Sequence, residues 1–288
     1  MSAPGGVAWV DGELVPRERA SVSIDDFGFR YGLTCFETML ARNGRVFRLA
    51  QHLDRLEASV QLFLATPPPR GELERAVAAA LEANALTEAS VRLSVTPGNG
   101  TRPALPATGT PHVIVTAEPL GALPARGRLW VSSVRLDAAR PWRAAKVGQY
   151  ATSLLARAEA EAQGYEDALL LDHAGRIAEA ATANVFFEVD GAIVTPSLGT
   201  GALPGVTRGC VMEVAASLGR PVREVELTLA DLPLATGAFV TSSIAGVAPV
   251  TSVAWDATGG RISWESSASA ALVEIERAYA DVVLTETR

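Results

Sequence analysis

The chain has 288 residues, of which 48% are hydrophobic and 20% are charged, and its net charge is -7. This length allows one large domain or two of ordinary size, each with its own core. An acidic chain without a local basic run is a poor partner for nucleic acid or for an anionic membrane surface.

Cysteines, histidines and apolar runs exclude further classes. Cys35 and Cys210 lie too far apart in sequence for a metal motif or a disulfide framework, which predicts reduced thiols and a cytoplasmic protein. His52, His112 and His173 are scattered, so we expect no metal site. The first residues lack the features of a signal peptide, and no apolar run reaches the roughly 18 to 20 residues of a membrane span.

The first half alternates turn signals with short apolar runs. Asp11-Gly12 and Asn43-Gly44 each join two strand-like runs, and such dipeptides supply the positive φ angles of hairpin turns. Residues 23–32 are interpreted as a polar turn. Helices are predicted over 49–63, where apolar residues recur at three- and four-residue steps, and over 72–84. Strands over 90–96 and 112–117 flank a loop rich in Gly and Pro, which fits either a passive linker or a lid.

The second half begins after a stretch with Pro and Gly at 118–127, which is the candidate domain boundary. Strands are predicted over 129–134, 168–172, 185–189, 193–195, 222–227 and 238–241, and helices over about 149–163, 209–218 and 267–283. Strands and helices without regular βαβ alternation indicate α+β domains in two lobes. A doubly wound sheet is not expected, because no phosphate-binding glycine motif stands where that fold needs one.

Lys146 lies in an apolar stretch, since it is the only charged residue between Arg143 and Arg157. Burial disfavours the charged form of lysine and lowers its pKa, and the neutral amine can attack an aldehyde to form a Schiff base. The plainer interpretation is a lysine that extends to solvent from a strand end, because fully buried lysines are rare. Other segments of the chain help to decide between the two.

Three further segments bear on Lys146. Residues 203–208 (LPGVTR) open a predicted helix, whose first N–H groups can bind a phosphate. Glu179 lies among alanines and needs a partner there, either an arginine or a protonated pyridine nitrogen. Thr241-Ser242-Ser243 follow a strand end with three hydroxyls that can donate to phosphate oxygens. Taken alone, the first segment is more readily an ordinary helix start and the third a capped turn, whereas for Glu179 a salt bridge to an arginine is an equal alternative.

Together these groups match what pyridoxal 5'-phosphate (PLP) requires of a protein. The chain also resembles the fold-type IV PLP enzymes, the class that includes branched-chain aminotransferases, D-amino-acid aminotransferases and aminodeoxychorismate lyases. The resemblance covers nearly the whole chain and rests on ordered motifs: WVDGELV, DDFGFRYGLTCFET, RLAQHLDRL, KVGQY, GRIAEAATANVFFEVDGAIVTPSL, GALPGVTR and FVTSSIAGVAPV.

The resemblance implies a role for each matched position. Lys146 would form the Schiff base and carry the proton between the substrate Cα and the cofactor C4', and Glu179 would keep the pyridine nitrogen protonated. The cofactor phosphate would be bound by Arg55, by the N–H groups of Val206 and Thr207 and by the hydroxyls of Ser242 and Ser243. Tyr150 would lie against the cofactor O3', although it stands one residue nearer the lysine than in the branched-chain enzymes.

Substrate choice is implied by the segment from Tyr31 to Leu40. Branched-chain enzymes resemble YGxxxFEGxR here, and this chain keeps Tyr31 and Phe36 but has Thr38 for the glycine and Leu40 for the arginine. The resulting FET is similar to many lyase sequences, in which the threonine lies near the substrate. We therefore expect Tyr31, Phe36 and Thr38 to be substrate contacts.

Arginines supply the candidate sites for a substrate carboxylate. Arg102 stands where D-amino-acid enzymes carry a carboxylate-binding arginine, which can grip an α-carboxylate with two hydrogen bonds. Those enzymes have a histidine two residues later, where this chain has Ala104. Arg92 and Arg30 are alternative anion-binding residues, and for each a structural salt bridge is an equal possibility.

The implied fold is an α+β, two-domain fold-type IV structure. A small N-terminal α/β domain covers residues 1–120, a linker covers 121–127, and a larger α/β barrel-like domain with the Schiff-base lysine covers 128–288, with PLP enclosed at their interface. We expect a cytoplasmic homodimer whose partner subunit supplies part of the substrate pocket. The expected activity is transfer of an amino group from a branched-chain or D-amino acid donor to a 2-oxo acid. The alternative is a 4-amino-4-deoxychorismate lyase that produces 4-aminobenzoate and pyruvate.

Overall fold

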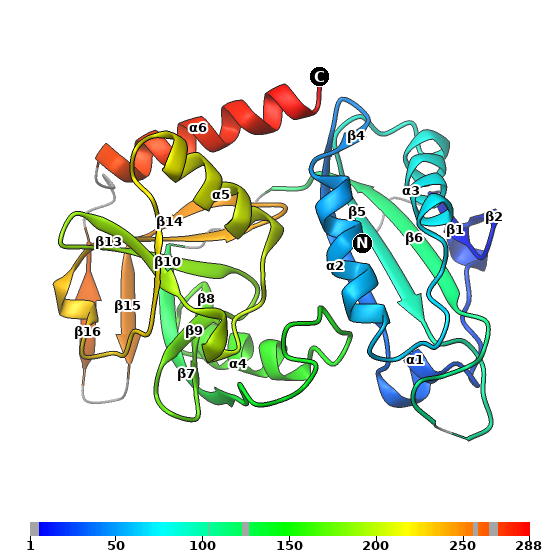
Figure 1. The fold of residues 1–288 in the computed structure, drawn as a ribbon, viewed down its shortest axis with the longest axis horizontal. Helices are drawn as coiled ribbons and strands as arrows, with labels where there is room; N and C mark the ends of the chain where they lie inside the picture. Colours follow the sequence, from blue (N-terminus) through cyan, green and yellow to red (C-terminus); the bar gives the residue numbers. More distant parts are fainter. Residues whose placement is uncertain (1–5, 103, 123–126, 256–258, 265–269) are drawn as a thin grey trace. The chain divides into compact units, whose positions relative to one another are not determined.

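The computed structural model describes residues 6–102, 104–122, 127–255, 259–264 and 270–288. Contacts between Cα atoms divide the chain, shown in Figure 1, into two compact units. The segments of unit 1 are Met1–Ala122, Ala145–Gln149 and Leu284–Arg288, and those of unit 2 are Leu123–Ala144 and Tyr150–Val283.

Unit 1 is built on a six-stranded antiparallel sheet with the strand order β2-β1-β6-β5-β3-β4. Its strands are β1 (Val7–Val10), β2 (Glu13–Pro16), β3 (Cys35–Arg42), β4 (Arg45–Val46), β5 (Ala89–Thr96) and β6 (His112–Pro119). Both hairpin predictions are confirmed, since the φ angles are 49° and 101° at Asp11 and Gly12 and 49° and 73° at Asn43 and Gly44. Positive φ at both central residues is what the favoured two-residue turn requires.

Two helices cover one face of this sheet. α2 (Leu49–Val60) packs on β3, and α3 (Arg70–Ala83) packs on β1, β5 and β6. Val91, Leu93 and Val95 of β5 are buried toward the helices, whereas Arg92 points to the other face because side chains alternate along a strand. The predicted helix over 49–63 therefore exists, with its apolar stripe buried, but it ends at Val60.

The segment expected to be a polar turn contains a short helix, α1 (Phe27–Tyr31), which follows the short 3-10 helix η1 (Arg17–Arg19). Asp26 caps α1, since its carboxylate accepts a hydrogen bond from the N–H of Phe29 at 3.0 Å. Gly32 ends the helix at a φ of 68°, a left-handed angle that glycine adopts readily. Asp26 is fully buried, and a buried carboxylate needs hydrogen-bond donors. The N–H of Phe29 is one of them.

Unit 2 contains two five-stranded sheets, with the strand orders β12-β11-β10-β13-β14 and β16-β15-β7-β8-β9. Leu169 and Val253 of the second sheet share one buried core with Val185 and Val240 of the first, so the two sheets pack face to face. The strands are β7 (Arg128–Leu136), β8 (Asp167–Asp172), β9 (Ile177–Ala180), β10 (Asn184–Val189), β11 (Ala192–Pro196), β12 (Arg223–Val225), β13 (Ala235–Ser242), β14 (Gly246–Val250), β15 (Ser252–Trp255) and β16 (Gly260–Ser263).

The helices of unit 2 lie on the outside of these sheets. α4 packs on β7 and β8, and α5 packs on β13. The helical segments that lie wholly in unit 2 are α4 (Ala151–Ala162), η2 (Leu198–Thr200), α5 (Val206–Ser217) and η3 (Leu232–Leu234), whereas α6 (Ala270–Glu286) begins in unit 2 and ends in unit 1. α5 begins three residues before its predicted start at 209, because Gly205 supplies the helix boundary. Residues 267–269 of the last predicted helix lie outside the described residues, and α6 continues past the predicted end at 283.

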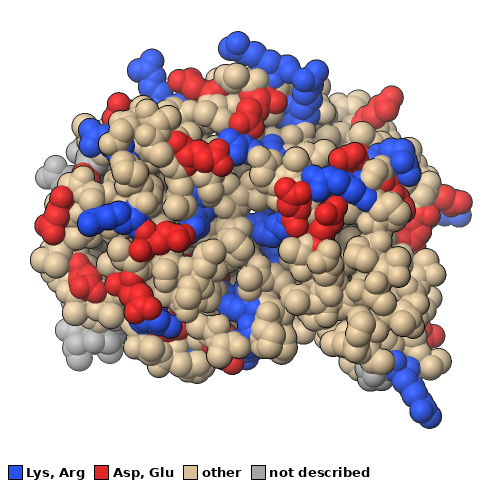
Figure 2. Space-filling model, in the orientation of Figure 1, with Lys and Arg blue, Asp and Glu red and all other residues tan. Residues whose placement is uncertain are grey.

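The division of the chain differs from the expected domains at two places. The segment Ala145–Gln149, which holds Lys146, and the C-terminal segment Leu284–Arg288 both have their contacts in unit 1. Part of the expected linker, residues 123–126, lies outside the described residues. Within the part of the chain that the structure describes, no helix is both long and apolar enough to cross a bilayer. Figure 2 shows acidic and basic side chains interspersed on one face of the molecule.

Candidate active site

Lys146 lies at the edge of β3 in unit 1. Phe36 donates its N–H to the carbonyl of Lys146 at 3.0 Å, and Gly148 donates to the carbonyl of Thr34 at 2.6 Å, which forms a short antiparallel bridge. The side chain of Lys146 is half-buried, and its Nζ lies 4.5 Å from the centroid of the Phe36 ring. The lysine predicted for the large domain is therefore held by the sheet of unit 1.

The Phe36 ring connects Lys146 with Arg92. The Cζ atom of Arg92 lies 3.9 Å from the ring centroid, and in the sheet register Arg92 is directly opposite Thr38. Phe36 and Thr38 are two residues apart on β3 and share a face, and Arg92 lies on that face as well. The structure thus brings three of the predicted substrate residues together beside Lys146.

The remaining substrate candidates belong to α1 and to the loop between β5 and β6. Tyr31 is at the end of α1, and Arg102 is exposed in the loop. Arg30 donates to the carbonyl of Gly100 at 3.0 Å and lies over the ring of Tyr31, so its guanidinium ties α1 to the loop. The substrate-binding roles of Tyr31 and Arg102 stay predictions.

The opposite face of β3 carries a buried ionic cluster of Glu37, His52 and Arg55. Arg55 donates Nε to Glu37 Oε1 at 2.8 Å and Nη2 to Oε2 at 2.6 Å, and His52 Nδ1 lies 2.7 Å from Oε2. Burial alone would raise the pKa of Glu37, but the Arg55 charge and the hydrogen bonds from His52 and Arg55 lower it. The carboxylate can then only accept, so His52 Nδ1 is the donor.

His52 is kept neutral by the same surroundings. Burial lowers its pKa and outweighs the hydrogen bond and the charge of Glu37, which raise it. The cluster consequently holds one carboxylate and one guanidinium in a fork geometry, which fixes the plane of Arg55. Neither Glu37 nor His52 was predicted as a site residue. The sequence did contain a signal for this cluster. His52 and Arg55 are three residues apart on the predicted helix, so they lie on one face of it, beside the apolar stripe.

Glu179 of β9 is in unit 2, and its partners include Arg143 and the N–H of Leu203. Arg143 Nη2 forms an ion pair with Oε1, and the N–H of Leu203 donates to Oε2 at 2.8 Å. The arginine that the sequence left as an alternative partner is therefore Arg143. The backbone of Gly201 leaves room for it, because a Cβ atom there would lie 3.1 Å from Arg143 Cγ.

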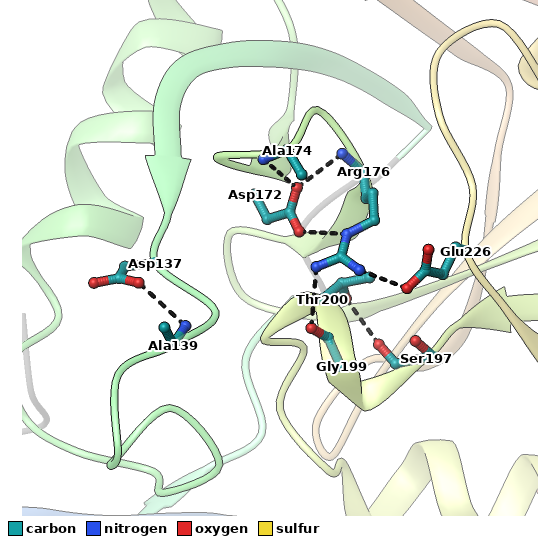
Figure 3. Close-up of polar contacts among 9 residues, drawn as sticks. All are labelled: Asp137, Ala139, Asp172, Ala174, Arg176, Ser197, Gly199, Thr200 and Glu226. Carbon is teal, nitrogen blue, oxygen red and sulfur yellow. Dashed lines mark hydrogen bonds and ion pairs between the residues drawn. The ribbon is translucent and has the colours of Figure 1, made fainter.

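A second arginine fixes the chain just before Leu203, as Figure 3 shows. Arg176 donates Nε to Asp172 Oδ2 at 2.6 Å, Nη1 to Glu226 Oε1 at 2.5 Å and Nη2 to the carbonyl of Gly199 at 3.3 Å. Arg176 directly precedes β9, and Gly199 is part of η2. The arginine thus ties the strand that carries Glu179 to the turn that leads to Leu203.

The N-terminus of α5 lies at the same end of the sheet as Thr241 and Ser242, the last residues of β13. The N-cap residue of α5 is Gly205, which has no side chain that could accept hydrogen bonds from the first N–H groups of the helix. These N–H groups include those of Val206 and Thr207. Asn184, at the start of β10, donates to the carbonyl of Leu203 at 2.8 Å and pairs in register with Thr241. The last strand residue, Ser242, directly follows Thr241.

This part of unit 2 has the donors that a phosphate needs. Helix N-terminal N–H groups and their dipole favour an anion. The hydroxyl of Thr241 is buried and has no hydrogen-bond partner among the described residues. Because a Cβ atom at Gly205 would lie 2.1 Å from Asn184 Oδ1, only glycine fits that close approach. The N–H groups at the start of α5 and these hydroxyls therefore fit a phosphate chemically.

The sequence also led to predictions about Tyr150, the two cysteines and a metal site. Tyr150 is the residue that precedes α4 in unit 2 and is half-buried. Its contact with a cofactor O3' stays a prediction. Cys35 and Cys210 are both buried, and their reduced state stays a prediction. Among the described residues, no group of three or more His, Cys, Asp or Glu side chains could hold a metal ion.

Known proteins are similar to this chain in sequence and in fold. A family model described as amino-transferase class IV matches residues 34–253. A probable branched-chain-amino-acid aminotransferase of Rickettsia conorii is 32% identical over 256 residues, which cover 85% of this chain and 86% of that protein. A crystal structure of the T.th. branched-chain amino acid aminotransferase with pyridoxamine 5'-phosphate has a TM-score of 0.85 and 30% identity, over 99% of this chain and 95% of that one.

A related lyase has the same fold. The crystal structure of 4-amino-4-deoxychorismate lyase from Pseudomonas aeruginosa has a TM-score of 0.82 and 29% identity, over 95% of this chain and 98% of that one. The resemblance to fold-type IV enzymes and the expected two-domain α+β fold are thereby confirmed. By sequence and by fold, the chain belongs to the class IV aminotransferases.

Proposed function

We propose that this aminotransferase binds PLP through Lys146 and uses it to transfer an amino group from a branched-chain amino acid to a 2-oxo acid. Family membership, a solved relative with pyridoxamine 5'-phosphate and the fit of the donor groups support this proposal. When bound, PLP supplies an aldehyde for Lys146 and a pyridine ring that accepts electrons.

The observation that carries the proposal is the placement of Lys146 beside Phe36, Thr38 and Arg92. Its amine lies over an aromatic ring on the face that holds the expected substrate contacts. A lysine there can bond covalently to the cofactor aldehyde. It can also take a proton from the substrate Cα and return it at the neighbouring cofactor carbon, because one flexible amine reaches both atoms.

Two groups of residues would hold the phosphate. Arg55, whose guanidinium is oriented by Glu37, presents a bidentate donor in unit 1. The N-terminus of α5 presents N–H groups at Val206 and Thr207 in unit 2, and Ser242 and Ser243 present hydroxyls. A dianionic phosphate suits both kinds of donor.

Glu179 would accept the N–H of the pyridine ring and keep its nitrogen protonated. Arg143 and the N–H of Leu203 hold this carboxylate in unit 2, and carboxylate oxygens are acceptors of the kind that a protonated pyridine nitrogen needs.

Arg92 is the arginine that the structure favours for a substrate carboxylate, because it shares a face with Phe36 and Thr38. Replacing Arg92 by lysine removes the planar fork but keeps the charge, so KM for the amino donor should rise about tenfold or more. The same change at the exposed Arg102 tests the alternative. A larger rise in KM for Arg102→Lys than for Arg92→Lys would reverse the assignment.

Spectroscopy of the half-reaction tests the proposed function. The holoenzyme is mixed with single L- or D-amino acids, and loss of the cofactor's visible absorbance is followed as the amino group moves to the cofactor. Branched-chain L-amino acids should bleach this band, and Lys146→Ala should lack the band in the first place.

The lyase remains the second candidate because of Thr38, which stands where branched-chain enzymes have glycine. If no amino acid bleaches the band and 4-amino-4-deoxychorismate yields 4-aminobenzoate and pyruvate, the aminotransferase proposal is wrong. The homodimer, the cytoplasmic location and a substrate pocket completed by the partner subunit are predictions of the resemblance. Light scattering of the purified holoenzyme tests the dimer.

A further inference from the structure

Ser59 of α2 connects the helix of Arg55 with the backbone of Lys146. Its hydroxyl donates to the carbonyl of Arg55 at 2.8 Å and accepts the N–H of Lys146 at 3.2 Å. Ser59 is 2% exposed, so water does not compete for these contacts. One hydroxyl offers one donor and two acceptor positions, and both capacities are used here.

The contact lies where the bridge to β3 ends. The bridge pairs Cys35 with Val147, and its two hydrogen bonds are those of Phe36 with Lys146 and of Gly148 with Thr34. The N–H of Lys146 goes to Ser59 instead of forming part of this bridge. The residue that must point its amine at the cofactor is therefore fixed from both sides, by β3 through its carbonyl and by α2 through its N–H.

We infer that Ser59 is a positioning residue that sets the distance between the two anchors of the cofactor in unit 1. The inference rests on the proposed function, in which Arg55 binds the phosphate and Lys146 the aldehyde. Both anchors attach to one rigid ligand, so their spacing decides whether both can engage at once. Arg55 is fixed in orientation by Glu37, and Ser59 transmits the position of that helical turn to Lys146.

The contact itself is testable in the cofactor-free protein. In Ser59→Ala, hydrogen exchange at the Lys146 amide should become about tenfold faster, because a buried hydrogen bond of typical strength is lost. Ser217→Ala is the matched control. Ser217 lies in unit 2, and its hydroxyl likewise donates to a carbonyl of its own helix, that of Val214, at 2.7 Å. Exchange at Lys146 should be unchanged in that control. Equal exchange in Ser59→Ala and the native protein would overturn the inference.

The effect on cofactor binding is tested by a double-mutant cycle with Lys146→Ala. In the native background, Ser59→Ala should weaken PLP binding, measured by equilibrium dialysis, about five- to tenfold. In the Lys146→Ala background, Ser59→Ala should change PLP affinity less than about twofold. That background has only one anchor, Arg55, so the distance between the two anchors no longer matters. Binding of inorganic phosphate should also change less than about twofold.

The outcomes separate the inference from the proposed function. If Lys146→Ala leaves PLP affinity and the visible band unaltered, the proposed function is wrong, and the inference falls with it. If Lys146→Ala abolishes the band but Ser59→Ala weakens PLP binding equally in both backgrounds, only the inference about Ser59 is overturned. A loss confined to the native background supports it.

Discussion

Replacing Glu37 by glutamine should destabilise the cofactor-free protein by about 3 to 5 kcal/mol, the usual cost of removing one partner from a buried ion pair. The carboxylate of Glu37 is fully buried, and Arg55 and His52 donate to it at 2.6 to 2.8 Å. Glutamine has nearly the same shape, but it carries no charge and replaces one acceptor oxygen by a donor NH₂ group. At least one N–H of Arg55 or His52 would then face another donor.

The size of the destabilisation depends on the guanidinium of Arg55, which loses its carboxylate partner in Glu37→Gln. Arg55 has a side chain that is 10% exposed, so its guanidinium would stay charged in a largely dehydrated place without its carboxylate. An exposed pair gives a matched control. Glu161 pairs with Arg157 at 2.9 Å on α4, and its side chain is 56% exposed, so Glu161→Gln should cost less than about 1 kcal/mol.

Urea unfolding of the two variants and the native protein at pH 7 measures both values, with the slope of the transition compared to exclude a change in the unfolded state. Destabilisation of Glu37→Gln by less than about 1 kcal/mol, similar to Glu161→Gln, would refute the reasoning. It would mean that Glu37 and Arg55 do not form a buried ion pair.

The pH dependence of stability gives a second test of the same cluster. Burial holds the pKa of His52 below its ordinary value of about 6.5, so its neutral form is favoured in the folded state. The contribution of His52 is therefore complete above about pH 6.5 and is lost as the pH falls through its folded-state pKa, by up to about 1.4 kcal/mol per pH unit. The lowered pKa of Glu37 has the same sign and acts below about pH 4.3. His52→Gln should remove the upper window only.

Three further predictions concern other parts of the structure. Burial, together with the charge of Glu37, raises the pKa of Cys35 to about 12, so its thiol should react with a disulfide reagent at pH 8 at least about a hundredfold more slowly in the folded protein than in urea, as thiol release will show. Gly205→Ala should cost about 1 to 3 kcal/mol, because the new Cβ would meet Asn184 Oδ1 at 2.1 Å, and Asn184→Ala should recover part of the loss in thermal unfolding. Arg176→Met should speed hydrogen exchange in residues 198–203, and unchanged exchange there would contradict the tie to Gly199.

The hairpins and the long helices could be predicted because their signals are local. Asp-Gly and Asn-Gly determine backbone angles at the residues themselves, and the apolar stripe of α2 lies within fifteen residues of chain. α1 was missed because five residues are too few for a periodic pattern. β14, β15 and β16 were missed because they are short and end at turns, and β15 needs its parallel partner β7 from the distant chain.

The candidate site divides in the same way. Lys146, Glu179 and the start of α5 stand out because their neighbours in sequence are unusual for a charge or a helix start. Arg143 could not be assigned to Glu179, because 36 residues separate them and any of several arginines would have fitted. Glu37 lies between Phe36 and Thr38 in a largely buried strand, and its ion-pair partner Arg55 comes from α2, which the strand sequence does not reveal.

Strand β3 now explains how one segment serves two tasks. Side chains alternate along a strand, so Glu37 turns to α2 and orients Arg55, whereas Phe36 and Thr38 turn to Lys146 and Arg92. A change at Thr38 therefore alters the surface beside the lysine without touching the ion pair on the other face. This separation lets residue 38 differ from the glycine of branched-chain enzymes while the proposed phosphate anchor stays the same. Substrate preference in this chain should accordingly respond to Thr38→Gly, while PLP affinity should not.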